Sequence, residues 1–218
     1  MIIRTDIFIG TMKKFFATVM YCCVVAFPSM VSAQEQKPNV IYILADDLGY
    51  GDVGYNGQEL IETPELDELA HNGMRFTNHY CGNAVCAPSR ASLLMGQHPG
   101  HAYIRSNSPG YPDGQTPIPA DSETLGKLMQ RAGYKTACIG KWGLGSFHDT
   151  GNPNKQGFDY FYGYTDQVKA HNYYPKYLWQ NGIKQFLDNG NGKQNDYSHD
   201  LFTAEAISFI KQNKNEPF

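Results

Sequence analysis

A short apolar run near the start of the chain limits the folds that the rest can adopt. Val40 to Ala45 is continuous in apolar and β-branched residues and follows Pro38 and Asn39. A run without polar alternation is typical of a strand buried on both faces of a parallel sheet. Asp46 and Asp47 come next. Ligands gather beyond the carboxyl ends of such strands, so the two acids indicate a site, with a solvated turn as the alternative.

Helix and strand signals alternate after this run. Thr63 and Pro64 predict the start of a helix that ends at Gly73. Ser122 begins a second predicted helix, which ends at Gly133. The segments expected as strands after these helices are Met74 to Tyr80 and Tyr134 to Ile139. Strand, helix and strand in alternation predict an α/β fold.

The last third of the chain carries a hairpin signal and a helix signal. Tyr177 to Phe186 has Asn181 and Gly182 at its centre, the pair that favours a two-residue hairpin turn. A final amphipathic helix is predicted from the spacing of Phe202, Ala206, Phe209 and Ile210. Residues 213–218 leave this helix and begin an extended segment, so we expect the chain to be truncated.

The first 33 residues have the pattern of an export signal. Basic residues precede an apolar run from Phe15 to Phe27, and small residues end the segment at Ala33. The run is too short to span a bilayer. We therefore expect a signal peptide at 1–33, no stable membrane anchor, and an exported product in the periplasm or outside the cell.

Charge and cysteine content narrow the function classes. The formal net charge is -3, and the sequence has no basic patch of the kind that binds nucleic acid. We therefore expect no nucleic-acid partner. After removal of the signal, the chain keeps Cys81, Cys86 and Cys138. An odd number of thiols in an oxidising compartment argues against a disulfide framework and suggests a special role for one of them.

The stretch from Cys86 to Gly96 carries the strongest chemical signal. Pro88 favours the first turn of a helix, so Cys86 is expected just ahead of a short helix whose free N–H groups and dipole attract an anion. Arg90, one turn further on, can reach back to the same place and hold an oxyanion. The alternative is a buried structural cysteine ahead of a helix.

This stretch resembles the signature of type I sulfatases, in which Cys-x-Pro-Ser-Arg marks a cysteine oxidised to formylglycine. The segment from Gly133 to Trp142 resembles a second signature of that family. Asp46 and Asp47, after the first predicted strand, resemble the metal-binding residues near the start of such enzymes. The resemblance covers about residues 38–145. It implies an alkaline phosphatase-like α/β/α sandwich with a largely parallel central sheet, incomplete at its C-terminus, with 34–218 as the N-terminal part of the catalytic domain.

The resemblance also implies roles for individual residues. Asp46, Asp47 and position 86 would hold Ca²⁺, with Mg²⁺ as a second possibility. Hydrated formylglycine at position 86 would attack sulfur, and sulfate would leave as the aldehyde reforms. Arg90 would stabilise the hydrated group, and Lys141 would act in catalysis and bind sulfate oxygens. An ordinary loop lysine is the alternative at position 141.

The sequence departs from the family pattern near Lys141. Gly143 stands where such enzymes commonly have a histidine, so one sulfate contact is missing or comes from elsewhere. Further metal ligands are expected beyond residue 218, and the chain alone is expected to be inactive. His171, in an aromatic segment, is a candidate for substrate binding, with a surface loop histidine as the alternative.

Three functions remain open from the sequence. The first is a sulfuric ester hydrolase acting on a sulfated small molecule or glycan, with a formylglycine-generating enzyme as its maturation partner. The second is a phosphonate or phosphodiester hydrolase of the same superfamily. The third is a truncated chain that binds anions without turnover.

Overall fold

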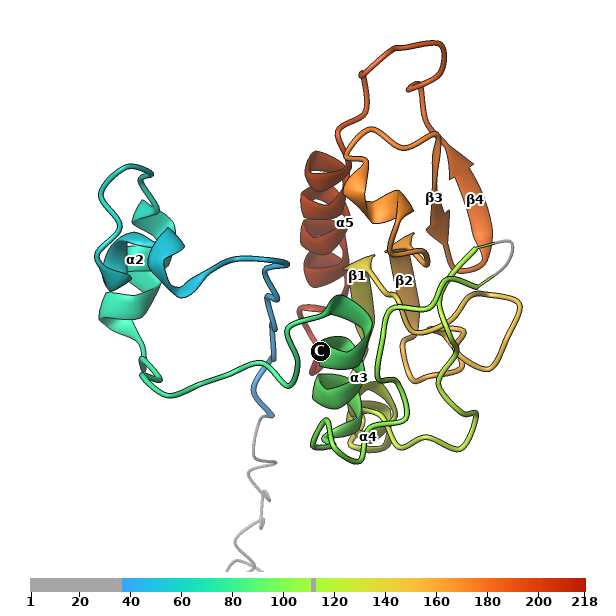
Figure 1. Cartoon of the computed structure of the whole chain (residues 1–218), viewed down its shortest axis with the longest axis horizontal. Helices are drawn as coiled ribbons and strands as arrows, with labels where there is room; N and C mark the ends of the chain where they lie inside the picture. Colours follow the sequence, from blue (N-terminus) through green and yellow to red (C-terminus); the bar gives the residue numbers. More distant parts are fainter. Residues whose placement is uncertain (1–36, 111–112) are drawn as a thin grey trace, which may run out of the picture. The chain divides into compact units, whose positions relative to one another are not determined.

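A four-stranded mixed sheet organises the second half of the computed structural model, which describes residues 37–110 and 113–218 (Figure 1). The strands, in their spatial order, are β1 (Ala137–Lys141), β2 (Tyr160–Tyr164), β3 (Tyr177–Gln180) and β4 (Ile183–Phe186). β1 and β2 are parallel, whereas β3 and β4 continue the sheet antiparallel. Lys141 and Tyr164 are register partners, so the parallel strands end side by side.

Several helices confirm the signals in the sequence. The helical elements are η1 (Tyr50–Asp52), η2 (Gly54–Asn56), α2 (Pro64–Asn72), α3 (Cys86–Met95), α4 (Leu125–Arg131), η3 (Lys169–His171) and α5 (Ser198–Asn213). Pro64 opens α2 and Gly73 follows its end, as predicted. In the part of the chain that the structure describes, no helix combines the length and apolarity needed to cross a membrane.

Alternate residues of β2 bury opposite faces of the sheet. Phe161 belongs to a buried cluster with Ala87 and Ala91 of α3, whereas Tyr162 belongs to a second cluster that packs against Phe202 of α5. Successive side chains of a strand point to opposite faces, so α3 and α5 cover opposite sides of β2. Figure 1 shows α3 and α5 beside β1 and β2. The start of α3 is thereby brought close to the ends of the parallel strands.

The predicted hairpin is confirmed. β3 and β4 pair in antiparallel register around Asn181 and Gly182. Both residues have positive φ, 46° and 87°, which is the backbone that a two-residue turn of this kind requires.

Two predicted strands are wrong. Val40 to Ala45 and Met74 to Tyr80 form no strand, and their apolar side chains are exposed, reaching 80% at Ile43 and 79% at Met74. A strand needs a hydrogen-bonded neighbour and a covering layer. Among the described residues, the only backbone hydrogen bond from the first segment to another segment joins Val40 N to Phe218 O at 2.7 Å.

Other boundaries differ from the prediction by a few residues. β1 begins at Ala137 rather than Tyr134, because the backbone N–H of Thr136 donates to the Asp159 carboxylate instead of to a strand. α4 begins at Leu125, three residues after the predicted Ser122, because Thr124 caps it. β2 was not predicted at all.

Thr124 provides a test of this packing. Its buried hydroxyl accepts from Lys127 N at 3.2 Å and donates to Gln156 O at 2.6 Å. Thr124→Ala removes the helix cap and leaves a buried carbonyl unpaired, so the free energy of unfolding should fall by about 1–3 kcal/mol. Denaturant unfolding measures this change. The control Thr203→Ala, on an exposed face of α5, should change stability by less than about 0.5 kcal/mol. Equal losses of stability in the two variants would contradict the role of Thr124 as a buried helix cap.

Candidate functional site

Three segments far apart in the sequence meet at the side chain of Lys141. Its ammonium lies 2.6 Å from Asp46 Oδ2 and 3.3 Å from Cys86 Sγ. Lys141 is the last residue of β1, and Cys86 is the first residue of α3 rather than the residue ahead of it. The structure therefore brings together three residues that the sequence predicted for one site.

Arg90 completes this group, which we call the Lys141 cluster: Asp46, Cys86, Arg90 and Lys141. Arg90 Nη2 lies 3.3 Å from Asp46 Oδ1, and Nη1 donates to the Lys141 carbonyl at 2.5 Å. The exposed fraction of the side chain is 12% for Arg90 and 9% for Lys141. Arg90 Nε is buried without a hydrogen-bond partner among the described residues. A buried N–H donor without an acceptor is rare in a folded protein, which makes Arg90 Nε a candidate donor to a ligand oxygen.

The cluster has an excess of positive charge. Burial acts to raise the pKa of Asp46, but hydrogen bonds and charge from Lys141 and Arg90 outweigh it and hold the pKa below its usual value. The carboxylate is therefore ionised at neutral pH, and one negative charge faces two positive ones. Such a site attracts an anion, and the amino end of α3 adds to the attraction.

One supporting residue was missed by sequence reasoning. Asn107 Oδ1 accepts a hydrogen bond from Ala87 N at 2.9 Å and so uses one free N–H at the start of α3. Asn107 lies in a loop 20 residues away, and no pattern in the sequence marks it. It fixes the turn that carries Cys86.

Two predicted site residues are not joined to the cluster. Asp47 has φ of 60° and is exposed, and His171 ends η3 with an exposed side chain. Within residues 37–110 and 113–218, no hydrogen bond or ion pair connects either side chain with Lys141 or Cys86. Their roles stay predictions.

The described residues do not complete a metal site. Asp46 offers the carboxylate oxygens that a hard cation prefers, but both of them face Lys141 and Arg90. No group of three or more His, Cys, Asp or Glu side chains in the described part of the chain could hold a metal ion. This part of the chain can at most contribute some of the ligands.

The three described cysteines differ in their surroundings. Cys81, Cys86 and Cys138 are all free. Burial of the sulfur raises the pKa of Cys138 to about 12, against a smaller opposite effect of the Arg90 charge, although the residue as a whole keeps some exposure. Cys81 is exposed, and of the three only Cys86 belongs to the Lys141 cluster.

Comparison with known proteins gives a consistent match. A family model described as Sulfatase matches residues 38–218. The chain is 35% identical over 186 residues to N-acetylglucosamine-6-O-sulfatase of Bacteroides thetaiotaomicron, covering 85% of this chain and 30% of that protein. It is 44% identical over 128 residues to human arylsulfatase G, covering 59% of this chain and 24% of that protein.

One solved structure is also similar to this chain. It is described as a complex with its substrate D-glucosamine-2-N,6-O-disulfate, and it aligns with a TM-score of 0.65 and 34% identity, over 84% of this chain and 33% of that one. The chain thus spans about a third or less of the proteins that it matches here. The fold of these neighbours confirms the predicted alkaline phosphatase-like class, of which the described sheet forms part.

The pKa of Cys138 predicts its reactivity. At pH 8 the thiolate fraction of Cys138 should be roughly one in ten thousand, whereas Cys81 is exposed to a reagent in solution. Iodoacetamide labelling of the folded protein, read by peptide mass spectrometry, should modify Cys81 and spare Cys138. Both should react at similar rates in urea. Equal labelling in the folded state would contradict the assigned burial.

Proposed function

Since the chain belongs to the sulfatase family, we propose that it forms part of the catalytic domain of an enzyme that hydrolyses sulfate monoesters on a carbohydrate or aryl substrate. The Lys141 cluster is the observation that carries the proposal. A sulfate ester presents anionic oxygen, and the cluster offers two cations with little exposure and an unpaired donor, with Lys141 next to the Cys86 sulfur. A structural cysteine would not require these neighbours.

Cys86 is proposed as the precursor of formylglycine, made by a maturation enzyme that recognises its sequence context. The hydrated aldehyde supplies a nucleophilic oxygen and a way to release sulfate that an unmodified thiol lacks. The Cys86 sulfur marks where that oxygen would lie, 3.3 Å from the Lys141 ammonium. Lys141 would donate to sulfate oxygens, and the free Arg90 Nε would donate to the same group or to the side chain at position 86.

A divalent cation, Ca²⁺ or Mg²⁺, is proposed at Asp46, Asp47 and position 86. Its charge would offset the negative charge of the ester. Because the described residues supply too few ligands, no step of the reaction is assigned to the metal.

Glycan specificity and export are also part of the proposal. One relative is named for a sulfated N-acetylglucosamine, and a solved neighbour is described with a disulfated glucosamine as substrate. These names support a sulfated sugar as the partner. We also propose that residues 1–33, which lie outside the described residues, are an export signal.

Replacement of Cys86 tests the proposed nucleophile. Cys86→Ala in the full-length protein should abolish hydrolysis of an aryl sulfate, because no oxygen nucleophile can then form at this position. Circular dichroism should show an unchanged fold. The matched control Cys81→Ala, at an exposed cysteine outside the cluster, should keep full activity.

Two results would overturn the proposal. One is full aryl sulfate hydrolysis by Cys86→Ala. The other is a preference of the unaltered protein for the matching aryl phosphate over the aryl sulfate.

A further inference from the structure

A hydrogen bond from a distant loop completes the first turn of α3. Val85, the residue before the helix, provides no side-chain cap, and Pro88 has no N–H to donate. The Ala87 N–H donates to Asn107 Oδ1 at 2.9 Å. Because Ala87 is 1% exposed, water has little access to this N–H, and without Asn107 it would be a buried donor without an acceptor. Asn107 thus does for α3 what a capping side chain does for other helices.

This contact lies directly beside the proposed nucleophile. The nitrogen of Ala87 is bonded to the carbonyl carbon of Cys86, so the bond to Asn107 holds the backbone that carries the Cys86 side chain. The Cys86 sulfur in turn lies 3.3 Å from the Lys141 ammonium. A contact that fixes the Ala87 N–H therefore also limits where the side chain at position 86 lies against Lys141.

The loop that provides this contact is a strap with two paired legs, which we define as residues 107–110 and 113–118. Thr116 N donates to Ser108 O at 2.9 Å, and an antiparallel bridge joins the two legs at Gln115. Gln115 is 1% exposed, so the second leg runs through the interior. The asparagine that starts the strap is therefore held by the pairing of the legs, although its own side chain is exposed.

The second leg of the strap is anchored close to Lys141 in the chain. Ile118 N donates to Leu144 O at 3.1 Å, and both side chains are fully buried. Gly114 packs so closely on Gly145 that a Cβ atom at position 114 would collide with the Gly145 carbonyl oxygen. The strap is thus bonded at one end to the first turn of α3 and at the other to the segment that follows Lys141.

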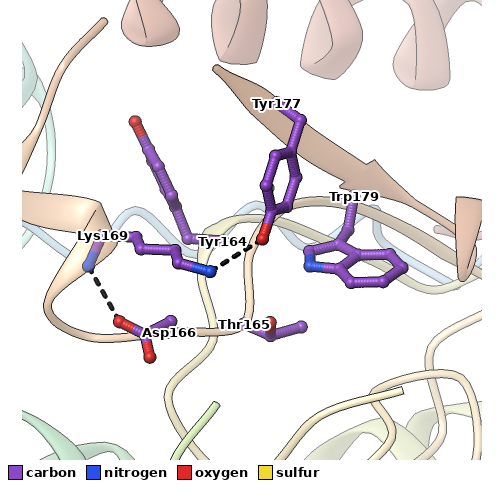
Figure 2. Close-up of a pocket in the computed structure, with 7 residues that line it drawn as sticks. Tyr164, Thr165, Asp166, Lys169, Tyr177 and Trp179 are labelled. Atoms are coloured by element: carbon purple, nitrogen blue, oxygen red, sulfur yellow. Dashed lines mark hydrogen bonds between the residues drawn. The ribbon is translucent and has the colours of Figure 1, made fainter. Parts of the chain in front are cut away.

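Two carboxylates fix the same leg to the segment after β2. Gly114 N donates to Asp166 Oδ2 at 3.3 Å, and Lys169 N donates to Asp166 Oδ1 at 2.8 Å, a contact drawn in Figure 2. Asp113, the preceding residue of the strap, is 5% exposed and pairs with Lys169 and Lys184. The first residue of the strap therefore reaches α3 from a well-anchored base.

We infer that Asn107 is a positioning residue: through its bond to Ala87 N it sets where the side chain at position 86 lies against the Lys141 ammonium, and thereby the rate of hydrolysis. The inference rests on the proposed function, in which position 86 supplies the attacking oxygen. Within residues 37–110 and 113–218, no hydrogen bond or ion pair joins the Asn107 side chain to a side chain of the Lys141 cluster, so its effect passes through the backbone. Misplacing reacting atoms by about 1 Å can lower a rate roughly a hundredfold.

The test compares Asn107→Ala with Asn107→Asp in the full-length protein, with an aryl sulfate as substrate and rates corrected for the fraction of position 86 that carries the aldehyde. Asn107→Ala leaves the Ala87 N–H unpaired, so kcat should fall about ten- to a hundredfold with KM almost unchanged. Asn107→Asp keeps an oxygen that accepts from this N–H, so kcat should return to within about threefold of the unaltered protein. KM should rise in Asn107→Asp alone, because the added carboxylate repels an anionic ester.

Hydrogen exchange provides a readout that does not depend on activity. Exchange of the backbone amides in the first turn of α3, read by peptide mass spectrometry, should be about tenfold faster in Asn107→Ala and unchanged in Asn107→Asp. Ser106→Ala is the matched control. Ser106 is the neighbouring exposed residue, and its hydroxyl bonds to Ser108 Oγ at 3.1 Å rather than to α3. This variant should keep the exchange rates, kcat and KM of the unaltered protein.

Three results would overturn the inference. The first is full kcat in Asn107→Ala. The second is an equal rise of KM in both Asn107 variants with kcat unchanged, which would mean that the amide contacts the substrate directly. The third is a low kcat in Asn107→Asp with normal exchange of α3. An unaltered protein that does not hydrolyse the aryl sulfate would overturn the proposed function instead, and the exchange rates would still decide whether Asn107 holds α3.

Discussion

The balance of charge around Lys141 is the constraint on which the site depends. Two cations with little exposure share one carboxylate, that of Asp46. A unit charge 4 Å from an opposite one gains about 4 kcal/mol at an effective dielectric constant near 20, against about 1 kcal/mol in bulk water. Partial burial therefore strengthens the attraction of the excess positive charge for a nearby anion. It also makes Asp46 necessary, because two unpaired cations at this depth would repel each other.

The packing of α3 on the β1–β2 strand pair positions these charged side chains. α3 packs its small residues Ala87 and Ala91 against the sheet, which allows its first turn to approach the end of β1. Trp142, the next residue in the chain after Lys141, lies in the hydrophobic core. Its indole N–H donates to Gly151 O at 2.7 Å. Lys141 is thus anchored from both sides, by strand pairing before it and by a buried ring after it.

Local signals in the sequence predicted much of the fold. Asn181 with Gly182 determined the hairpin, and Pro64 with Gly73 delimited α2, because the backbone preferences of these residues act within a few positions. The segment 40–45 was predicted as a strand from its apolar residues alone. A strand also depends on a partner segment, and the described chain offers it only one backbone bond at Val40.

The distinction between local sequence signals and contacts across the fold also applies to the site. Family resemblance named Cys86, Arg90, Lys141 and Asp46, which lie within recognisable signatures, and the structure brings these four side chains together. Asn107 could not be found in this way, because it acts through a loop contact across the fold, to Ala87. Gly143 was interpreted as a missing histidine, and the structure places the buried amide of Gln167 next to it.

Mass spectrometry of the peptide that contains position 86 tests the central claim most directly. The full-length protein should be expressed together with a formylglycine-generating enzyme and digested under conditions that protect thiols. We predict that this peptide lacks the thiol of Cys86 and carries the mass of an aldehyde or its hydrate, while the Cys138 peptide keeps its thiol. An unmodified Cys86 in protein that hydrolyses sulfate esters at full rate would contradict the account.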